Sequence, residues 1–397
     1  MGRSKRKASR NTSTATATAT AAAVVSISDL PNHITCDILS RLPLNSIFIC
    51  KRVCKIWRTI ILEPYFAKLH RSRSPLSLIF YRNGTERNND NSPSSHFEIL
   101  QLYDPPVKSR RNATMKFTTE IYFPHVNIQI VDSCNGLVLL SNYSSYIDDH
   151  VIVCNPLRAQ HLVLPKPPKH ALRDSYIELG FGHSPVTDQY KVVRLTHVYS
   201  IPARLYCDIY TIGIDDEWRS IGDIGQPPFY LVSRLFFLNG ALHWLGHEDS
   251  WFICYFDIEK EQFGSFPLPS EFGETFLHLG VVDNWLYVRN DHSVGPCKFW
   301  VMKDYGDFGS WTLEWVIEGP LTHRFNGPVK PLKMLKDGTL LMMLTSCNPP
   351  TNLSEATLAS YNPQTRVLKE KKYCGILPQG DSVADVPCFF SPMDALK

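Results

Sequence analysis

The sequence predicts a small all-α segment followed by a large all-β domain, and three observations support this prediction. Apolar residues recur at helical spacing between positions 30 and 60. After position 75, short apolar runs alternate with Gly, Pro, Asn and Asp clusters, which is typical of strands and turns. The strand-and-turn pattern also returns about every 50 residues. A β-propeller best fits this repeat, because a closed ring buries the faces that one four-stranded unit leaves exposed.

Composition limits the classes of protein that the chain can represent. Its 397 residues favour two domains of unequal size, and its 44% hydrophobic and 12% aromatic content is enough for a packed core. The net charge is only +3, and five basic residues fall within the first ten. So small an excess does not favour nucleic acid as a partner.

The cysteines and the apolar runs argue against several kinds of site. Eleven cysteines are scattered without a C-x-x-C pair, so we expect reduced, mostly buried thiols and neither a metal site nor a cofactor. Reduced thiols are typical of a protein of the cytoplasm, the nucleus or both. The longest apolar runs, such as "TLLMMLT", are too short to cross a bilayer, so no membrane association is expected.

Residues 1–26 are predicted to form a disordered basic and Thr/Ala-rich tail, because they have low complexity and no acidic residue. Three interpretations remain open for this tail. It is a solvated segment without a targeting signal, a nuclear localisation patch around Lys5 to Lys7, or an organellar transit peptide.

The stretch "LPNHITCDILSRLPLNSIFICKRVCKIWRTI", from Leu30 to Ile60, predicts a helical hairpin. Pro31 suits a first helical position, and Ile34 and Ile38 begin an apolar stripe that ends before Pro43. A second helix is predicted from apolar residues that share one face, namely Ile47, Cys50, Val53, Cys54 and Trp57. So small a hairpin needs a partner, either the rest of its own chain or a groove on another protein, and the spacing leaves both open.

The stretch extended to "ILEPYFAKLH" resembles the F-box motif in its plant-like form, with LP, I-L-x-R-L-P, V-C-K-x-W-R and a trailing proline-aromatic helix. The resemblance implies binding to the Skp-type adaptor of a cullin-RING ubiquitin ligase. The adaptor-facing positions that it implies are Leu30, Pro31, Ile34, Ile38, Leu39, Leu42, Pro43, Val53, Cys54 and Trp57. The chain departs from the motif at Cys36, where an acid is common, and at Ile49 and Cys50, which replace a basic-aromatic pair.

Six segments after position 76 share the shape strand, turn, strand. Their expected turn residues are 51, 53, 49, 47 and 58 positions apart: Asp104, Asn155, Asp208, Asp257, Asp304 and Asn362. Tight hairpins are also expected in "SCNGLVLL", "FLNGALHWL", "VVDNWLYV" and "LKDGTLLMML". Each unit is therefore a meander of about four strands, the size of a propeller blade. The segment "VPCFF" at 386–390 is expected to return and complete the first blade.

The all-β part resembles the F-box associated domain of plant F-box proteins, of the kind with kelch-like repeats. The diglycine and the fixed Tyr and Trp of a true kelch blade are missing. A large β-sandwich of lectin type is the second interpretation, and the steady spacing argues against it. The predicted divisions are a tail at 1–26, an F-box at 27–70 and a substrate-binding propeller at 76–393. The change of texture between His70 and Leu76 predicts that few contacts join the two folded parts.

Patterns that would indicate catalysis have ordinary explanations. His243 and His247 have the spacing of a zinc helix but fall in a strand context, and "LGFGHSP" at 179–185 lacks the helix that follows a phosphate loop. We therefore expect no catalytic residue, and the sequence identifies no substrate-binding residue.

The two resemblances together imply the substrate-recognition subunit of a Skp–cullin–F-box ubiquitin ligase. Its partners would be the adaptor, through it the cullin and RING subunits, and an unknown protein destined for ubiquitination and proteasomal degradation. The alternative is a lectin-like or enzymatic β-propeller with the helices as a structural cap.

Overall fold

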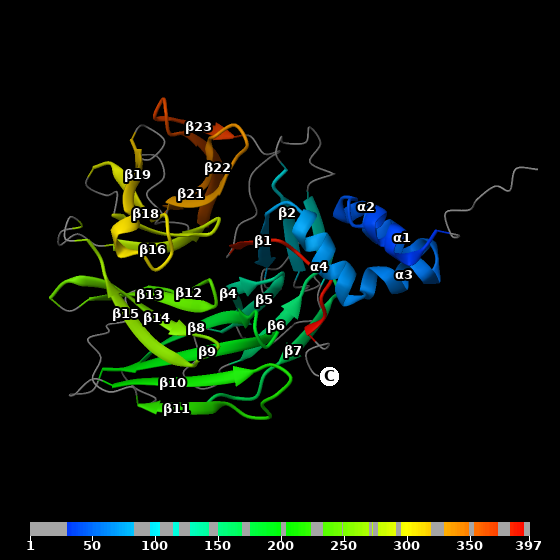
Figure 1. Ribbon diagram of the computed structural model, residues 1–397, viewed down its shortest axis with the longest axis horizontal. Coiled ribbons are helices and arrows are strands. Elements are labelled where there is room, and N and C mark those ends of the chain that lie inside the picture. The colour runs from blue at the N-terminus through cyan, green and yellow to red at the C-terminus, as the bar shows by residue number, and fades with distance from the viewer. Residues whose placement is uncertain are drawn as a thin grey trace, which may run out of the picture.

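In the part of the chain that the computed structural model describes, four α-helices precede six β-sheets, which confirms the predicted fold class (Figure 1). The structure describes residues 30–82, 96–103, 114–118, 128–142, 150–168, 175–199, 204–223, 233–247, 249–269, 272, 277–290, 295–318, 329–348, 353–371 and 382–392. The predicted tail at 1–26 lies outside these residues.

The helices are short and follow one another closely: α1 (Asn32–Leu39), α2 (Leu44–Val53), α3 (Lys55–Leu62) and α4 (Pro64–Arg73). Prolines set three of their starts, because the fixed φ of proline suits a helix entry and its missing N–H costs nothing there. Pro31 and Pro43 precede α1 and α2, and Pro64 is the first residue of α4.

The second predicted helix is not continuous, so that part of the sequence prediction is wrong. Cys54 adopts an extended conformation, with φ −152° and ψ 164°, and separates α2 from α3. Its Sγ accepts the backbone N–H of Trp57 at 3.4 Å and so caps the new helix. Val53 is exposed and Trp57 is partly buried against the core, so the two do not share the common face that continuous helical spacing predicts.

Each of the six sheets holds four antiparallel strands, and each is a blade of the propeller. The first blade consists of β24 (Ser382–Asp385), β1 (Ser77–Arg82), β2 (His96–Gln101) and β3 (Thr114–Thr118), and the second of β4 (Gln129–Cys134), β5 (Leu137–Ser141), β6 (Val151–Asn155) and β7 (Gln160–Val163). The third blade consists of β8 (Ser175–Ser184), β9 (Gln189–Val198), β10 (Arg204–Thr211) and β11 (Arg219–Asp223), and the fourth of β12 (Phe236–Leu238), β13 (Ala241–His247), β14 (Trp251–Asp257) and β15 (Gln262–Pro267). The fifth blade consists of β16 (Leu277–Val282), β17 (Trp285–Asn290), β18 (Cys297–Met302) and β19 (Trp311–Ile317), and the sixth of β20 (Val329–Met334), β21 (Leu340–Asn348), β22 (Leu353–Asn362) and β23 (Val367–Lys371). A short 3-10 helix, Phe308–Ser310, lies between β18 and β19.

The first strand of each blade lies toward the centre of the ring. In succession, β24 contacts β4, β4 contacts β8, β8 contacts β12, β12 contacts β16 and β16 contacts β20. Figure 1 shows the fourth strands β11, β19 and β23 at the periphery. Apolar side chains fill the spaces between adjacent blades, so neighbouring sheets share their cores.

The predicted Asn-Gly hairpins are confirmed. Asn135 and Gly136, between β4 and β5, have φ values of 55° and 80°, and Asn239 and Gly240, between β12 and β13, have 49° and 79°. Positive φ at two successive residues gives the tight turn whose twist matches a β-hairpin. These turns join the first and second strands of their blades.

The predicted turn residues of the outer hairpins are confirmed at three positions and wrong at one. The side-chain oxygens of Asn155, Asp257 and Asn362 each accept backbone N–H groups two or three residues ahead. Asp208 instead lies inside β10 and pairs with Arg194 at 3.3 Å. The turn of that blade is capped by Asp215, whose Oδ2 accepts the N–H of Thr211 at 2.6 Å. Asp304 occupies the bend after β18, and Asp104 lies outside the described residues.

The ring closes through a different segment from the predicted one. Strand β24 pairs antiparallel with β1, with Ser77 opposite Asp385, and so joins the end of the chain to the first blade. The sequence "VPCFF" begins one residue after β24 and is not a strand. That prediction is therefore wrong, because the closing strand is Ser382–Asp385 and lies immediately before the predicted segment.

The helices and the propeller share one core, which contradicts the expectation of few contacts between them. Phe389 is fully buried, and its ring centroid lies 5.7 Å from Phe48, 5.8 Å from Phe66 and 5.4 Å from His70. The same cluster includes strand residues such as Ile79. The segment that follows the closing strand therefore attaches α2 and α4 to the ring.

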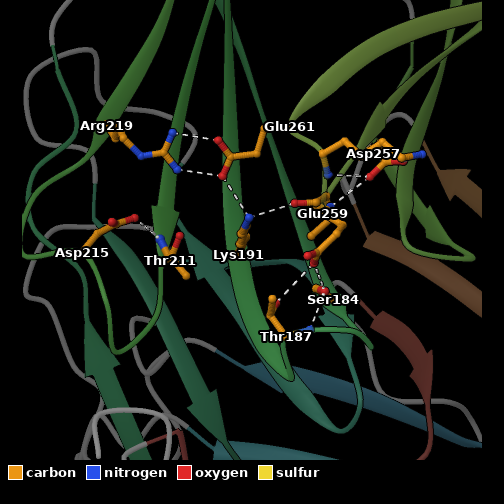
Figure 2. Close-up of polar contacts among 11 residues, drawn as sticks. Ser184, Thr187, Lys191, Thr211, Asp215, Arg219, Asp257, Glu259 and Glu261 are labelled. Atoms are coloured by element: carbon orange, nitrogen blue, oxygen red, sulfur yellow. Dashed lines mark hydrogen bonds and ion pairs between the residues drawn. The ribbon is translucent and has the colours of Figure 1, made fainter.

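A polar network joins the third blade to the fourth (Figure 2). The carboxylate of Glu261 accepts the Nζ–H of Lys191 at 2.9 Å and two guanidinium N–H groups of Arg219 at 2.7 and 2.8 Å. Lys191 also donates to the carbonyl oxygen of Ile258 at 2.9 Å. These contacts lower the pKa of Glu261 to about 2, chiefly through the hydrogen bonds from Arg219.

Candidate protein-docking face

Helix α1 exposes apolar side chains on the face opposite its core. Thr35, Cys36 and Leu39 are buried against the other helices, while Ile34 and Ile38 are 40% and 41% exposed. The two isoleucines are four residues apart and therefore adjacent on the helix surface. An aliphatic pair left in water at this spacing is typical of a face that docks on a partner.

Helices α2 and α3 add a second group of exposed apolar residues. Ile49 and Val53 are 67% and 60% exposed and again lie four residues apart on α2, and Ile56 follows at the start of α3 at 52%. Figure 1 shows α1, α2 and α3 to one side of the ring, with α4 beside β1 and β2. The exposed residues belong to the helices, so this part of the molecule presents apolar surface to solvent.

We define the docking face as Ile34, Ile38, Ile49, Val53 and Ile56. The ten positions that the sequence predicted differ in where they lie. The exposed ones are Pro31, Ile34, Ile38, Pro43 and Val53. The partly buried ones are Leu30, Leu42, Cys54 and Trp57. Leu39 is 2% exposed and supports α1 from behind. Leu42 and Trp57 also pack against the core that the helices share with the propeller.

Sequence reasoning did not assign Ile49 and Ile56 to this face. Ile49 stood out only as a departure from the family motif, although it precedes Val53 by one helical turn. Ile56 became recognisable only through the break at Cys54, which begins a new helix and changes the direction of its side chain.

Basic residues surround the docking face. Residues 30–73 contain eight Lys and Arg but only two acids, Asp37 and Glu63. Arg52, Lys55 and Arg58 are exposed beside the apolar residues of α2 and α3. Such a surface attracts a partner whose own surface is acidic.

One of the two acids is used inside the helical part. The Oδ1 of Asp37 accepts Nη2 of Arg73 at 2.6 Å, which ties α1 to the end of α4. Arg41 reaches Oδ2 of the same carboxylate at 3.1 Å. Hydrogen bonds from Arg41 and then Arg73 lower the pKa of Asp37. The pairing connects α1 to α4, and the basic character of the docking face comes from Arg52, Lys55 and Arg58.

The sequence patterns that would suggest catalysis lie in structural settings. His243 is buried in β13, where its ring nitrogens meet the carbonyl oxygen of Phe236 at 3.3 Å and the hydroxyl of Tyr305 at 2.8 Å. The glycines of "LGFGHSP" lie in or beside strand β8. Across the described ranges, no group of three or more His, Cys, Asp or Glu residues is placed to hold a metal ion. No helix of the described part is long and apolar enough to span a membrane.

Comparison with known proteins places two families along the chain. A model described as the F-box domain matches residues 27–69, and one described as the F-box associated beta propeller domain matches residues 83–390. An F-box protein of Arabidopsis thaliana is 26% identical over 385 residues, covering 88% of this chain and 89% of that protein. An F-box/kelch-repeat protein of the same plant is 29% identical over 252 residues, covering 61% of each. Among solved structures, a lectin of Aleuria aurantia superposes with a TM-score of 0.39 at 7% identity, covering 72% of this chain and 93% of the lectin.

Proposed function

Because this chain belongs to the F-box proteins that carry an F-box associated β-propeller domain, we propose that it is the substrate-recognition subunit of a Skp–cullin–F-box ubiquitin ligase. The observation that carries the proposal is the docking face on α1, α2 and α3. Its five aliphatic side chains stay exposed although the buried sides of these helices belong to the core that Phe389 shares with the propeller. Exposed apolar surface on helices whose other faces are already buried favours a second partner.

The proposed first partner is a Skp-type adaptor, which would bring the cullin and RING subunits with it. Aliphatic residues one turn apart on α1 and α2 suit insertion into a groove of the adaptor. The exposed cations Arg52, Lys55 and Arg58 suit an acidic rim around that groove.

In this proposal the chain acts by proximity and performs no covalent step itself. One end holds the ligase and the propeller holds the recruited protein, so a lysine of that protein meets a ubiquitin-charged enzyme at high effective concentration. The shared core supports this role, because it fixes the direction of the propeller relative to the docking face. We propose the nucleus, the cytoplasm or both as the place of action.

Co-purification of the full chain with a Skp-type adaptor and a cullin tests the proposal. Ile38→Asp and Val53→Asp each place a charge on the docking face and are expected to weaken adaptor binding about 30-fold or more. Val186→Asp is the matched control, since Val186 is 78% exposed but lies in the turn between β8 and β9. Adaptor binding that survives both docking-face variants would refute the proposal.

A further inference from the structure

A polar cavity of about 510 Å³ lies among the inner strands of the propeller. It is lined by residues in or next to the first strands of five blades, β24, β4, β12, β16 and β20, and by residues at the end of α4. A cavity of this size suits a ligand of a few side chains, because small-molecule and peptide pockets are commonly about 300 to 1,000 Å³. Proteins in which first strands converge in this way bring side chains from distant sequence positions together.

Four cations and two acids line the cavity: Arg71, Arg234, Lys330, Lys333, Asp132 and Asp283. Each acid accepts one backbone N–H, while the second carboxylate oxygen of Asp132 is buried without a hydrogen-bond partner. Asp132 Oδ1 accepts the N–H of Ser133 at 2.8 Å, and Asp283 Oδ2 accepts the N–H of Met334 at 3.0 Å. Among the residues that the structure describes, the side chains of the four cations form no hydrogen bond and no ion pair. Asp132 offsets part of the charge of Lys330, but the four cations outnumber the two acids, so the lining keeps a positive excess.

The cations divide between the two mouths of the cavity. Asp283 follows β16 and bonds to Met334, the last residue of β20, so the ends of these inner strands meet at one mouth. The charge of Arg71 acts on Asp385 and Cys134, which end β24 and β4, and α4 therefore lies at the same mouth. Lys330 and Arg234 belong to the beginnings of β20 and β12. These two residues consequently lie toward the end of the cavity away from the helices.

Arg234 and Lys330 both line this cavity, and their charges act on each other. The pKa of Lys330 is lowered, first by burial and then by the charge of Arg234, while Asp132 acts in the opposite direction. The charge of Arg234 also acts to lower the pKa of Glu178 on β8. Glu178 does not line the cavity, however, and its carboxylate accepts a hydrogen bond from the hydroxyl of Tyr176. Two neighbouring cations without a bonded counter-ion form a site that an anion stabilises.

We propose that the mouth formed by Arg234 and Lys330 binds an oxyanion, a carboxylate or a phosphate, carried by a peptide segment of the protein that the propeller recruits. This inference rests on the proposed function, because it assigns a chemistry to the recruited protein. The guanidinium of Arg234 suits paired hydrogen bonds to two oxygens, and the ammonium of Lys330 supplies a point charge. Phe236 and Phe237 in the same lining offer apolar contact to the segment that carries the anion.

Fluorescence polarisation on the full chain, co-expressed with a Skp-type adaptor, tests the proposal. The probes are three labelled peptides in one Gly-Ala background, containing glutamate, phosphoserine or glutamine. We expect the glutamate or the phosphoserine peptide to bind at least about tenfold more tightly than the glutamine peptide, and inorganic phosphate to compete. The peptide that binds more tightly identifies the source of the oxyanion.

Charge-neutral variants locate the site. Arg234→Gln and Lys330→Gln are each expected to weaken acidic-peptide binding about tenfold or more, and Lys330→Arg to restore most of it. Lys369→Gln is the matched control, because Lys369 is exposed on β23 of the same blade as Lys330. Equal binding of all three peptides by the unmodified chain overturns the proposal, and so does equal binding by the Arg234, Lys330 and Lys369 variants.

The same samples separate this inference from the proposed function. Adaptor retained on the column reports the docking face, and peptide binding reports the cavity. Lost peptide selectivity with retained adaptor refutes the oxyanion site alone. Retained selectivity without any adaptor refutes the ligase role and leaves the site in place. Because peptide selectivity and phosphate competition are measured on the unmodified chain, a variant that fails to fold does not decide the outcome.

Discussion

The side-chain amide of Asn155 donates to the carbonyl oxygen of Cys388 at 2.9 Å, across 233 positions of sequence. The same Nδ2 donates to the carbonyl oxygen of Phe390, and Oδ1 accepts the N–H of Leu157 at 2.8 Å. Asn155 is fully buried. One side chain therefore both forms the turn after β6 and holds the segment that carries Phe389 under the helices.

Asn155→Ala is expected to destabilise the protein far more than the same change at a similar turn. It leaves the carbonyl oxygens of Cys388 and Phe390 and the N–H of Leu157 without this partner, and each such group costs about 1 to 3 kcal/mol where it is buried. Asn362→Ala is the control, since Asn362 caps the equivalent turn after β22 through Gln364 and Thr365 only. Urea denaturation measures both, and equal losses of unfolding free energy would contradict this role of Asn155.

Phe389→Ala should loosen the helices from the ring. Removal of a fully buried phenylalanine costs about 3 to 5 kcal/mol, and here the lost contacts are those with Phe48, Phe66 and His70. Hydrogen exchange should then rise in α2 and α4 before it rises in blades far from them. Phe308→Ala, at a ring that is 47% exposed, serves as the control and should change exchange little.

The turns and the repeat were predictable from the sequence because they depend on local chemistry. Asn-Gly tolerates the positive φ of a tight hairpin, and this identified Asn135 and Asn239 correctly. The same reasoning failed at Asp208. The sequence does not distinguish an aspartate that caps a turn from one that lies in a strand and pairs with a buried arginine. Local pattern carries no information about the partner across the sheet.

The shared core could not be predicted for a related reason. The apolar faces of α2 and α4 show that something covers them but not what covers them. Their partner, Phe389, lies more than 300 positions away in the sequence and follows a strand of only four residues. The docking face was only partly predicted, because its definition depends on which apolar residues Phe389 and its neighbours leave exposed.

Glu261→Ala should destabilise the junction of the third and fourth blades. Lys191 is only 7% exposed, and without Glu261 its ammonium would keep just the carbonyl oxygen of Ile258. Loss of one member of a largely buried ion pair is expected to cost about 2 to 4 kcal/mol. Glu314→Ala is the control, because its pair with Lys303 is about one third exposed and should contribute less than about 1 kcal/mol. Thermal unfolding of the two variants should rank them in this order.

The histidine beneath the helices should make the protein sensitive to mild acid. Burial lowers the pKa of His70 to about 4 from an ordinary 6.5. Between these two pH values the imidazole is protonated in the unfolded chain and neutral in the folded chain. The contribution of neutral His70 to the free energy of unfolding is fully present above pH 6.5 and is lost as the pH falls toward 4. The stability of His70→Phe relative to the unmodified chain should therefore rise by about 3 kcal/mol between pH 7.5 and pH 4. Denaturation at several pH values checks this, and a constant difference would mean that His70 is not shielded.

The charge around the docking face should govern the rate at which the adaptor binds. Arg52 and Lys55 are exposed beside Val53 and Ile56 and would attract an acidic partner before contact. Arg52→Glu combined with Lys55→Glu should lower the association rate constant about tenfold at low salt. The difference should nearly vanish at about 1 M salt, where the Debye length falls to about 3 Å. Lys369→Glu, on the outer strand β23, should leave the association rate constant unchanged at both salt concentrations. Biolayer interferometry with a Skp-type adaptor measures these rates, and an association rate unaffected by the double variant would show that the adaptor approaches a different surface.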